Sequence, residues 1–144
     1  GPSTGRDAGP STGRDAGPDA DEGIDATHDL RSLAQSVAAF MDARDWAQYH
    51  APKNVAAAIA VEAAELQQIY LWRALEDPAD DKRREIEDEA ADIAICLLNF
   101  CNRVGFELGP AMLRKLAAAE RKYPAERVRG RSEKYDEYPE WEGE

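Results

Sequence analysis

The chain has 144 residues, a formal net charge of −11, 33% charged residues and 43% hydrophobic residues. This length suits a single domain, and the hydrophobic fraction is sufficient for a core. The acidity disfavours a protein that binds long nucleic acids or an anionic membrane, because such proteins present basic surfaces. No apolar run approaches the ~20 residues that a membrane span needs, and the sequence has no apolar signal-peptide region.

The chain contains two cysteines, Cys96 and Cys101. On a helix, residues at this spacing lie on different faces and would not pair readily as a disulfide. We therefore expect free thiols and a reducing, cytoplasmic setting.

The acidity is concentrated at the two ends of the chain. Residues 1–8 are repeated without change as residues 9–16, and the composition of residues 1–23 predicts a disordered low-complexity tail, either natural or left by an expression tag. Residues 133–144 hold one lysine and six acids, which predicts an acidic tail or an arm whose aromatic residues pack on a neighbouring subunit. Residues 24–132 hold 15 basic and 18 acidic residues, so the domain itself is close to neutral.

The first half of the domain predicts two helices. The first spans about residues 27–48, with Thr27 as a candidate N-cap. The apolar residues that recur at helical spacing on one face are Leu30, Leu33, Val37, Phe40 and Met41. The second helix spans about residues 53–75 and is rich in alanine. It follows Pro52, which the first turn of a helix accepts, and ends before Asp77-Pro78.

The second half of the domain predicts two more helices and no strand before Val128. The third spans about residues 82–104 and is followed by Gly105, a residue typical of helix C-termini. The fourth opens at Pro110 and ends near residue 123. Four helices of this length predict an all-α fold, either a four-helix bundle or half of a larger bundle that a second chain completes.

Four carboxylates interrupt the apolar pattern of the second and third helices. Glu62 and Glu65 are three residues apart in an alanine-rich stretch, and Glu89 and Asp92 repeat this spacing on the third helix. Residues at this spacing share one helix face. Neither residue of the first pair has a lysine or arginine at helical spacing. On antiparallel helices the two pairs can therefore converge.

Two interpretations of these carboxylates are open. They face solvent, as acids on helices usually do, or they form a quartet that binds a divalent cation. Unpaired carboxylates in apolar surroundings repel one another and are costly to desolvate, and a cation removes that conflict. All-oxygen ligands favour Mg²⁺ or Mn²⁺. A ferritin-like di-iron site is excluded, because it needs Glu-x-x-His motifs that His28 and His50 do not supply.

The sequence resembles the MazG-like all-α nucleoside triphosphate pyrophosphatases, especially the small dCTP pyrophosphatase branch. The paired carboxylates match the family's metal motif. Further matches are RDWAQYHAPKN at residues 44–54, Leu71-Trp72-Arg73 at the end of the second helix, and Lys-Tyr-Pro-Ala at residues 122–125, with Val128-Arg129-Gly130 and Lys134-Tyr135 behind it. The motifs occur in the family's order, and the resemblance covers about residues 28–138.

The resemblance implies a reaction. A (deoxy)nucleoside triphosphate would be hydrolysed between its α- and β-phosphates to a monophosphate and pyrophosphate, as a form of nucleotide pool sanitation. Residues 24–132 would form the catalytic domain, with Mg²⁺, or Mn²⁺, on Glu62, Glu65, Glu89 and Asp92. Glu65 is our choice for the general base that takes the proton of the attacking water. The family's dimers and tetramers imply a homodimer or homotetramer.

Further residues are candidates for substrate binding. Trp46 and Trp72 offer faces on which a nucleobase can stack, with core packing as the alternative. His50 can hydrogen-bond the base or a phosphate, or serve as a loop residue. The candidate phosphate ligands, each with a solvated surface charge as the alternative, are Lys53, Lys115 and Lys122, followed by Arg114 and Arg121.

Two positions depart from the dCTP pyrophosphatase pattern. Cys96 replaces a usual tyrosine and Ala119 replaces a usual asparagine, both in the family's nucleotide pocket. These changes leave the metal site and the reaction type intact but affect the positions that would select cytosine and contact the sugar. The candidate substrate is dCTP or a modified dCTP, with dUTP or a general nucleoside triphosphate as the alternative. A different class of function, an inactive helical module for nucleotide binding or assembly, is the remaining alternative.

Overall fold

The computed structural model describes residues 29–131, so the tails expected at residues 1–23 and 133–144 lie outside the described residues. The described range contains helices and no strand, which confirms the all-α prediction. The elements, with η for short 3₁₀ helices, are α1 (Leu30–Ala43), η1 (Ala47–Tyr49), α2 (Pro52–Tyr70), η2 (Asp80–Lys82), α3 (Arg83–Val104), α4 (Leu108–Lys122) and α5 (Ala125–Val128).

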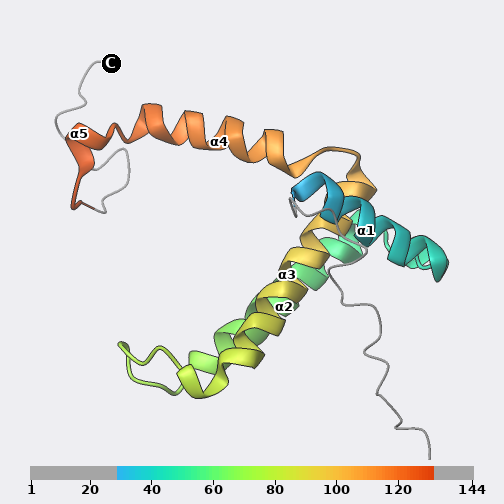
Figure 1. Cartoon of the computed structure of the whole chain (residues 1–144), viewed down its shortest axis with the longest axis horizontal. Coiled ribbons are helices and arrows are strands. Elements are labelled where there is room, and N and C mark those ends of the chain that lie inside the picture. Colours follow the sequence, from blue (N-terminus) through green and yellow to red (C-terminus); the bar gives the residue numbers. More distant parts are fainter. Residues whose placement is uncertain (1–28, 132–144) are drawn as a thin grey trace, which may run out of the picture.

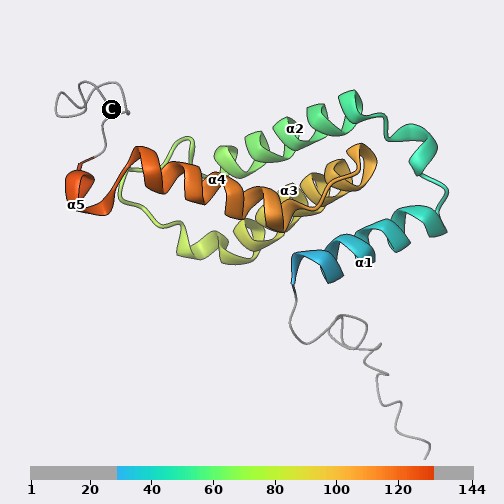
Figure 2. The same cartoon turned by 90° about the horizontal axis from the view of Figure 1, so that it is seen from above.

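The helices α2 and α3 form the centre of the fold. They pack as an antiparallel pair along most of their length (Figures 1 and 2). The helix α1 crosses the C-terminal part of α3, and α4 contacts α1 near its own start. From there α4 runs away from the α2–α3 pair, so that the two arms enclose an open angle (Figure 1).

The first helix is shorter than the sequence predicts. Asp29 is its N-cap, since its Oδ1 accepts a hydrogen bond of 2.7 Å from the backbone N–H of Ser32. The predicted cap, Thr27, lies outside the described residues. The helix ends at Ala43 and not near Gln48, because Asp45 takes a left-handed backbone conformation with φ 52°. This turn separates α1 from η1.

The connection between α2 and α3 is longer than the sequence predicts. The helix α2 begins at Pro52, as expected, but ends at Tyr70 and not near residue 75. Arg73 then forms a two-point ion pair with Asp81, at 2.7 and 2.9 Å, and a 3.3 Å contact with Asp77. Because Arg73 binds both carboxylates, it stabilises the connection between α2 and α3, which includes η2.

The C-terminus of α3 follows the sequence prediction. Gly105 has φ +95°, and the N–H groups of Gly105 and Phe106 both donate to the carbonyl of Cys101, at 2.8 and 3.1 Å. A glycine adopts this backbone conformation without steric cost. The next helix begins at Leu108, two residues earlier than expected, and a further short helix, α5, follows it.

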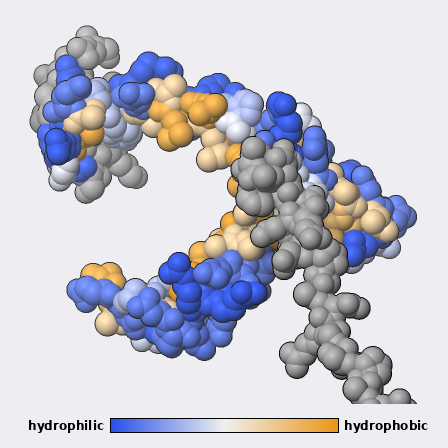
Figure 3. Space-filling model, in the orientation of Figure 1, coloured by the Kyte–Doolittle hydropathy of each residue, from blue (hydrophilic) through white to orange (hydrophobic). Residues whose placement is uncertain are grey.

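The core of the described residues is small. Its buried hydrophobic residues are Val55, Ala79, Leu98 and Cys101. By contrast, α4 leaves Met112, Leu113 and Leu116 47%, 70% and 62% exposed. The space-filling view shows apolar residues along the inner edge of α4 and on the edge of the α2–α3 arm that faces it (Figure 3). Within residues 29–131, no helix combines the length and the apolar character that a membrane span requires.

Candidate active site

The carboxylates of α2 and α3 converge. Carboxylate oxygens of Glu62, Glu89 and Asp92 all lie within 4.8 Å of one another. Glu65 is outside this group of three, but its charge acts on both Glu62 and Glu89, so it lies beside them. Helical spacing within each pair and the antiparallel packing of α2 on α3 produce this convergence.

Two of the four carboxylates have a buried oxygen. Glu62 and Glu89 are half-buried, and Oε2 of each is buried without a hydrogen-bond partner among the described residues. Glu65 and Asp92 are exposed. No arginine or lysine within residues 29–131 forms an ion pair with any of the four. Among the described residues, the cluster is thus a concentration of uncompensated negative charge.

The electrostatics of the cluster follow from this geometry. Burial raises the pKa of Glu62 above its usual value, and the neighbouring Glu65 raises it further. Burial likewise raises the pKa of Glu89, with Glu65 as the next largest cause. A cation would offset the negative charge of both carboxylates. Their buried Oε2 atoms, which have no hydrogen-bond partner among the described residues, are suitable ligands for a cation. These residues therefore fit a hard divalent metal ion.

Cys96 lies next to the acidic cluster. Burial raises the pKa of its thiol, and the charges of Glu62 and Asp92 raise it further. Such a thiol stays protonated and is a poor nucleophile. We therefore assign Cys96 no role as a nucleophile. Cys96 and Cys101 are both free cysteines.

An aromatic group lies on the segment between α1 and α2. The Trp46 ring is 41% exposed and makes edge-to-face contacts with Phe40 and His50, at centroid distances of 5.7 and 6.5 Å. The Arg44 guanidinium lies 3.7 Å from the centre of the Phe40 ring. Trp46 therefore keeps an accessible surface while its neighbours hold it in place.

His50 is connected to α3 by a residue that the sequence analysis did not single out. Its Nδ1 lies 3.2 Å from Nδ2 of Asn99, which is 5% exposed. The only sequence signal would have been the position of Asn99 on the same α3 face as Asp92, two turns further along. A single asparagine on a helix face does not by itself identify a functional residue.

The other candidate substrate residues are distributed over the surface. Trp72 is 91% exposed after the end of α2, so core packing does not explain it within the described residues. Lys53 is exposed in the first turn of α2. Lys115 and Lys122 are exposed on α4, which leads away from the acidic cluster (Figure 1). The fold of one chain thus does not bring Lys115 and Lys122 to the carboxylates.

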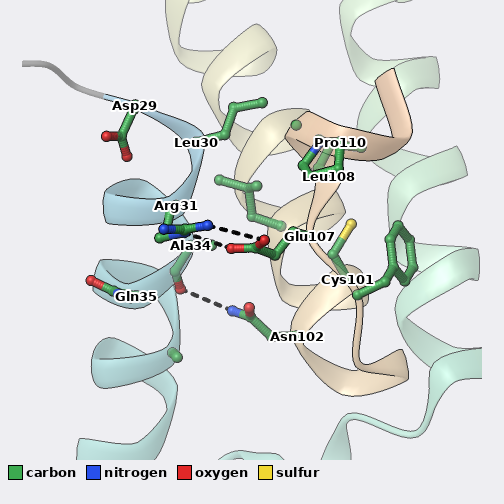
Figure 4. Close-up of a pocket in the computed structure, with 14 residues that line it drawn as sticks. Asp29, Leu30, Arg31, Ala34, Gln35, Cys101, Asn102, Glu107, Leu108 and Pro110 are labelled. Carbon is green, nitrogen blue, oxygen red and sulfur yellow. Dashed lines mark hydrogen bonds and ion pairs between the residues drawn. The ribbon is translucent and has the colours of Figure 1, made fainter. Parts of the chain in front are cut away.

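A pocket also lies away from these carboxylates. It has a volume of about 540 Å³ and lies between α1, the end of α3 and the start of α4 (Figure 4). Arg31 and Glu107 form an ion pair of 2.6 Å across it, and Asn102 donates a 2.9 Å hydrogen bond to the carbonyl of Ala34. No member of the carboxylate cluster lines this pocket, so its volume is no reason to place the reaction there. A shallower depression of about 370 Å³ on α2 includes Glu65.

Known proteins resemble this chain in sequence. The model of the MazG-like family matches residues 57–138, which include all four carboxylates. This chain belongs to the MazG-like family. The dCTP pyrophosphatase 1 of Homo sapiens is 31% identical over 115 residues, which cover 76% of this chain and 68% of that protein. The dCTP pyrophosphatase 1 of Mus musculus is 28% identical over the same length.

The structural comparison agrees with the sequence match. A pyrophosphatase from Archaeoglobus fulgidus DSM 4304 superposes with a TM-score of 0.62 at 36% identity, covering 66% of this chain and 92% of the other. The all-α pyrophosphatase family inferred from the paired motifs is thereby confirmed. This MazG-like protein is a nucleoside triphosphate pyrophosphatase.

Proposed function

We propose that this MazG-like protein hydrolyses dCTP or a modified dCTP to the monophosphate and pyrophosphate, with Mg²⁺ bound to Glu62, Glu65, Glu89 and Asp92. The observation that carries the metal assignment is the pair of buried, unpartnered Oε2 atoms on Glu62 and Glu89. A dCTP substrate is supported by similarity to proteins named dCTP pyrophosphatase 1. The proposed role is removal of modified or surplus nucleotides.

The metal would be held by oxygen ligands from two helices. Mg²⁺ prefers a few carboxylates and leaves positions for water and phosphate oxygens, and Mn²⁺ accepts the same ligands. When bound, such an ion offsets the charge of the triphosphate and lowers the pKa of a bound water. The metal-binding oxygens of Glu62 and Glu89 would be held in a fixed orientation, because both side chains are partly buried where α2 packs on α3.

Glu65 is the proposed catalytic base. It is exposed, and it is not one of the three carboxylates whose oxygens lie within 4.8 Å of one another. An oxygen of Glu65 is therefore free to accept a proton from a water positioned for attack on the α-phosphorus. In this assignment Glu62 mainly binds metal, whereas Glu65 contributes to both binding and proton transfer.

We assign Trp46 and Trp72 to base stacking and His50 to hydrogen bonding. Trp46 precedes the start of α2 and Trp72 follows its end, and the exposure of both residues supports the stacking role. Lys53, at the exposed start of α2, is a proposed phosphate ligand. The domain that carries these functions is proposed to span residues 24–132.

The protein is proposed to act as a homodimer or homotetramer. The apolar edge of α4 formed by Met112, Leu113 and Leu116 is exposed in the single chain and would be buried by a second copy. Charge supports the same arrangement, since residues 108–131 hold seven basic and two acidic residues, whereas residues 52–104 hold six basic and 11 acidic residues. A second copy would also allow Lys115 and Lys122 to approach a neighbouring acidic cluster.

The proposed compartment is the reducing cytoplasm. Its support is the presence of two free cysteines, Cys96 and Cys101, within the described residues. Free thiols persist where the redox potential keeps them reduced.

A substrate panel tests the proposal. Release of pyrophosphate is measured for dCTP, 5-substituted dCTP, dUTP and the ribonucleoside triphosphates, with Mg²⁺, with Mn²⁺ and with EDTA. We expect the highest kcat/KM for dCTP or a 5-substituted dCTP and no turnover in EDTA. Preference for dUTP, or equal rates for all bases, would overturn the substrate assignment. Full activity in EDTA would overturn the metal assignment, and nucleotide binding without turnover would indicate an inactive binding module.

A further inference from the structure

Asn99 is a buried polar residue to which the proposed reaction gives no role. It lies on α3, one helical turn after Cys96 and two turns after Asp92, on the same face of the helix. Its Nδ2 lies 3.2 Å from Nδ1 of His50, which is 49 residues earlier in the chain. This contact joins the helix that carries two of the carboxylates to the segment between α1 and α2.

The two ring nitrogens of His50 have different surroundings. Nδ1 faces Asn99, which is 5% exposed. Nε2 makes no hydrogen bond within residues 29–131, and it is not one of the buried unpartnered atoms of that range. Nε2 is therefore not fully buried. It is the ring nitrogen that a ligand can reach, beside the exposed Trp46 ring.

We propose that Asn99 is a positioning residue that fixes the tautomer of His50. Its Nδ2–H donates to Nδ1, so the neutral imidazole carries its proton on Nε2. With the Asn99 amide in this orientation, the opposite tautomer would set an imidazole N–H against an amide N–H, two donors with no acceptor between them. Asn99 thus acts through His50 and needs no contact with the substrate.

The fixed tautomer has a consequence for specificity. An imidazole with its proton on Nε2 offers the ligand one donor and no acceptor at that atom. It therefore favours an acceptor on the nucleoside, such as a ring carbonyl oxygen, and disfavours an exocyclic amino group at the same place. This inference rests on the proposed function, because it assigns the partner of His50 on the nucleotide.

The tautomer can be measured without any assay of activity. Long-range ¹H–¹⁵N correlation spectra of the full chain, labelled with ¹⁵N-histidine, distinguish protonated from unprotonated ring nitrogens. The chain has two histidines, and a His28→Gln variant assigns the signals. At about pH 9, where imidazole is neutral, we expect His50 to be protonated on Nε2. Protonation on Nδ1, or an equal mixture of both tautomers, would overturn the proposal.

Two matched variants on α3 test the role of Asn99. Asn99→Asp replaces the donor with a carboxylate, which accepts a hydrogen bond and should transfer the proton of His50 to Nδ1. We expect KM for the preferred nucleotide at about pH 9 to rise about three- to tenfold while kcat stays within about twofold, the pattern of a lost binding hydrogen bond. Asn102→Asp is the control. Its amide donates to the backbone carbonyl of Ala34, so we expect the tautomer of His50 and KM to stay unchanged.

A double-mutant comparison separates positioning from general packing. In a His50→Ala background, Asn99→Asp should cause no further rise in KM, because the residue through which Asn99 acts is gone. An additional rise of the same size would overturn the proposal. If Asn99→Asp does not fold, as judged by circular dichroism, the wild-type tautomer still decides. Absence of turnover by the wild type would overturn the proposed function, whereas normal turnover with the Nδ1–H tautomer would overturn this inference alone.

Discussion

Glu62 of α2 and Glu89 of α3 have oxygens within 4.8 Å of each other, and each also has a buried Oε2 without a hydrogen-bond partner. Neither has a cationic neighbour within residues 29–131 that would compensate its charge. Two facing acids in this state destabilise the metal-free fold when both are ionised. The stability of the protein should therefore depend on metal ions and on pH.

The first prediction concerns the metal-free protein. Burial raises the pKa values of Glu62 and Glu89 in the folded state, so folding retains protons that the unfolded chain has lost. Their stabilising contribution is full below the unfolded pKa of about 4.3 and is lost as pH rises through the folded pKa values. Thermal unfolding in EDTA should show that this contribution decreases as the pH rises above about 4.

Binding of Mg²⁺ should restore the stability that the metal-free protein loses as the pH rises. At neutral pH, free Mg²⁺ about tenfold above its Kd should raise Tm by about 5 °C or more. Glu62→Gln should raise Tm in EDTA and abolish the increase with Mg²⁺. An Mg²⁺-dependent increase that survives in Glu62→Gln and Glu89→Gln would show that the ion binds elsewhere.

The second prediction separates the two acids of α2. Glu62→Gln should reduce kcat/KM by about 100-fold or more, because it removes a metal ligand with a buried oxygen. Glu65→Gln should lower kcat while leaving most of the Mg²⁺ affinity, since Glu65 is exposed and lies outside the group of three. Calorimetric Mg²⁺ titrations alongside turnover assays provide the comparison. Equal loss of Mg²⁺ affinity in both variants would argue against a separate role of Glu65.

The third prediction uses two glycines near the junction of α3 and α4. Gly105 has φ +95°, so Gly105→Ala should destabilise the fold by about 1 kcal/mol. Gly109 lies in the first turn of α4, directly before Pro110. The proline ring disfavours a helical conformation for a preceding residue that carries a Cβ, so Gly109→Ala should not stabilise the fold, although Leu30 Cδ1 at 4.0 Å is the nearest atom outside its chain neighbours. Urea unfolding curves should show a lower midpoint for Gly105→Ala.

The fourth prediction concerns Arg73 in the α2–α3 connection. Its guanidinium lowers the pKa of Asp81 in the folded state. The contribution of the Arg73–Asp81 pair to folding stability is therefore full above the unfolded pKa of about 3.9 and is lost as pH falls through the folded pKa. Arg73→Gln should lower the urea midpoint at neutral pH, and its difference from wild type should shrink in acid. Arg84→Gln removes an exposed pair with Asp88 at 3.6 Å. It should have no measurable effect at either pH.

The fifth prediction addresses self-association through α4. Leu116 is 62% exposed in the single chain. Leu116→Asp should dissociate the proposed homo-oligomer, because it places a charge in an apolar contact, whereas Leu116→Met should leave the mass unchanged. Size-exclusion chromatography with light scattering measures the outcome. A monomeric wild type, or an unchanged oligomer in Leu116→Asp, would contradict the assignment of this surface.

Local sequence patterns predicted most of the helices but not where α1 and α2 end. The apolar spacing from Leu30 to Met41 identified α1, because helical periodicity is a property of neighbouring residues. The end of α1 depended on the left-handed conformation of Asp45, for which aspartate carries only a weak preference. Arg73 and Asp81 are eight residues apart in the sequence. Their ion pair belongs to an irregular connection that helical periodicity does not predict.

The all-α class, the family motifs and the four carboxylates were predictable from residue types at short, fixed spacings. Three features became visible once the chain was folded: the buried oxygens of Glu62 and Glu89, the contact between Asn99 and His50, and the course of α4 away from α2 and α3. Burial and long-range contacts depend on how distant segments pack, and no local pattern encodes the distance between two helices.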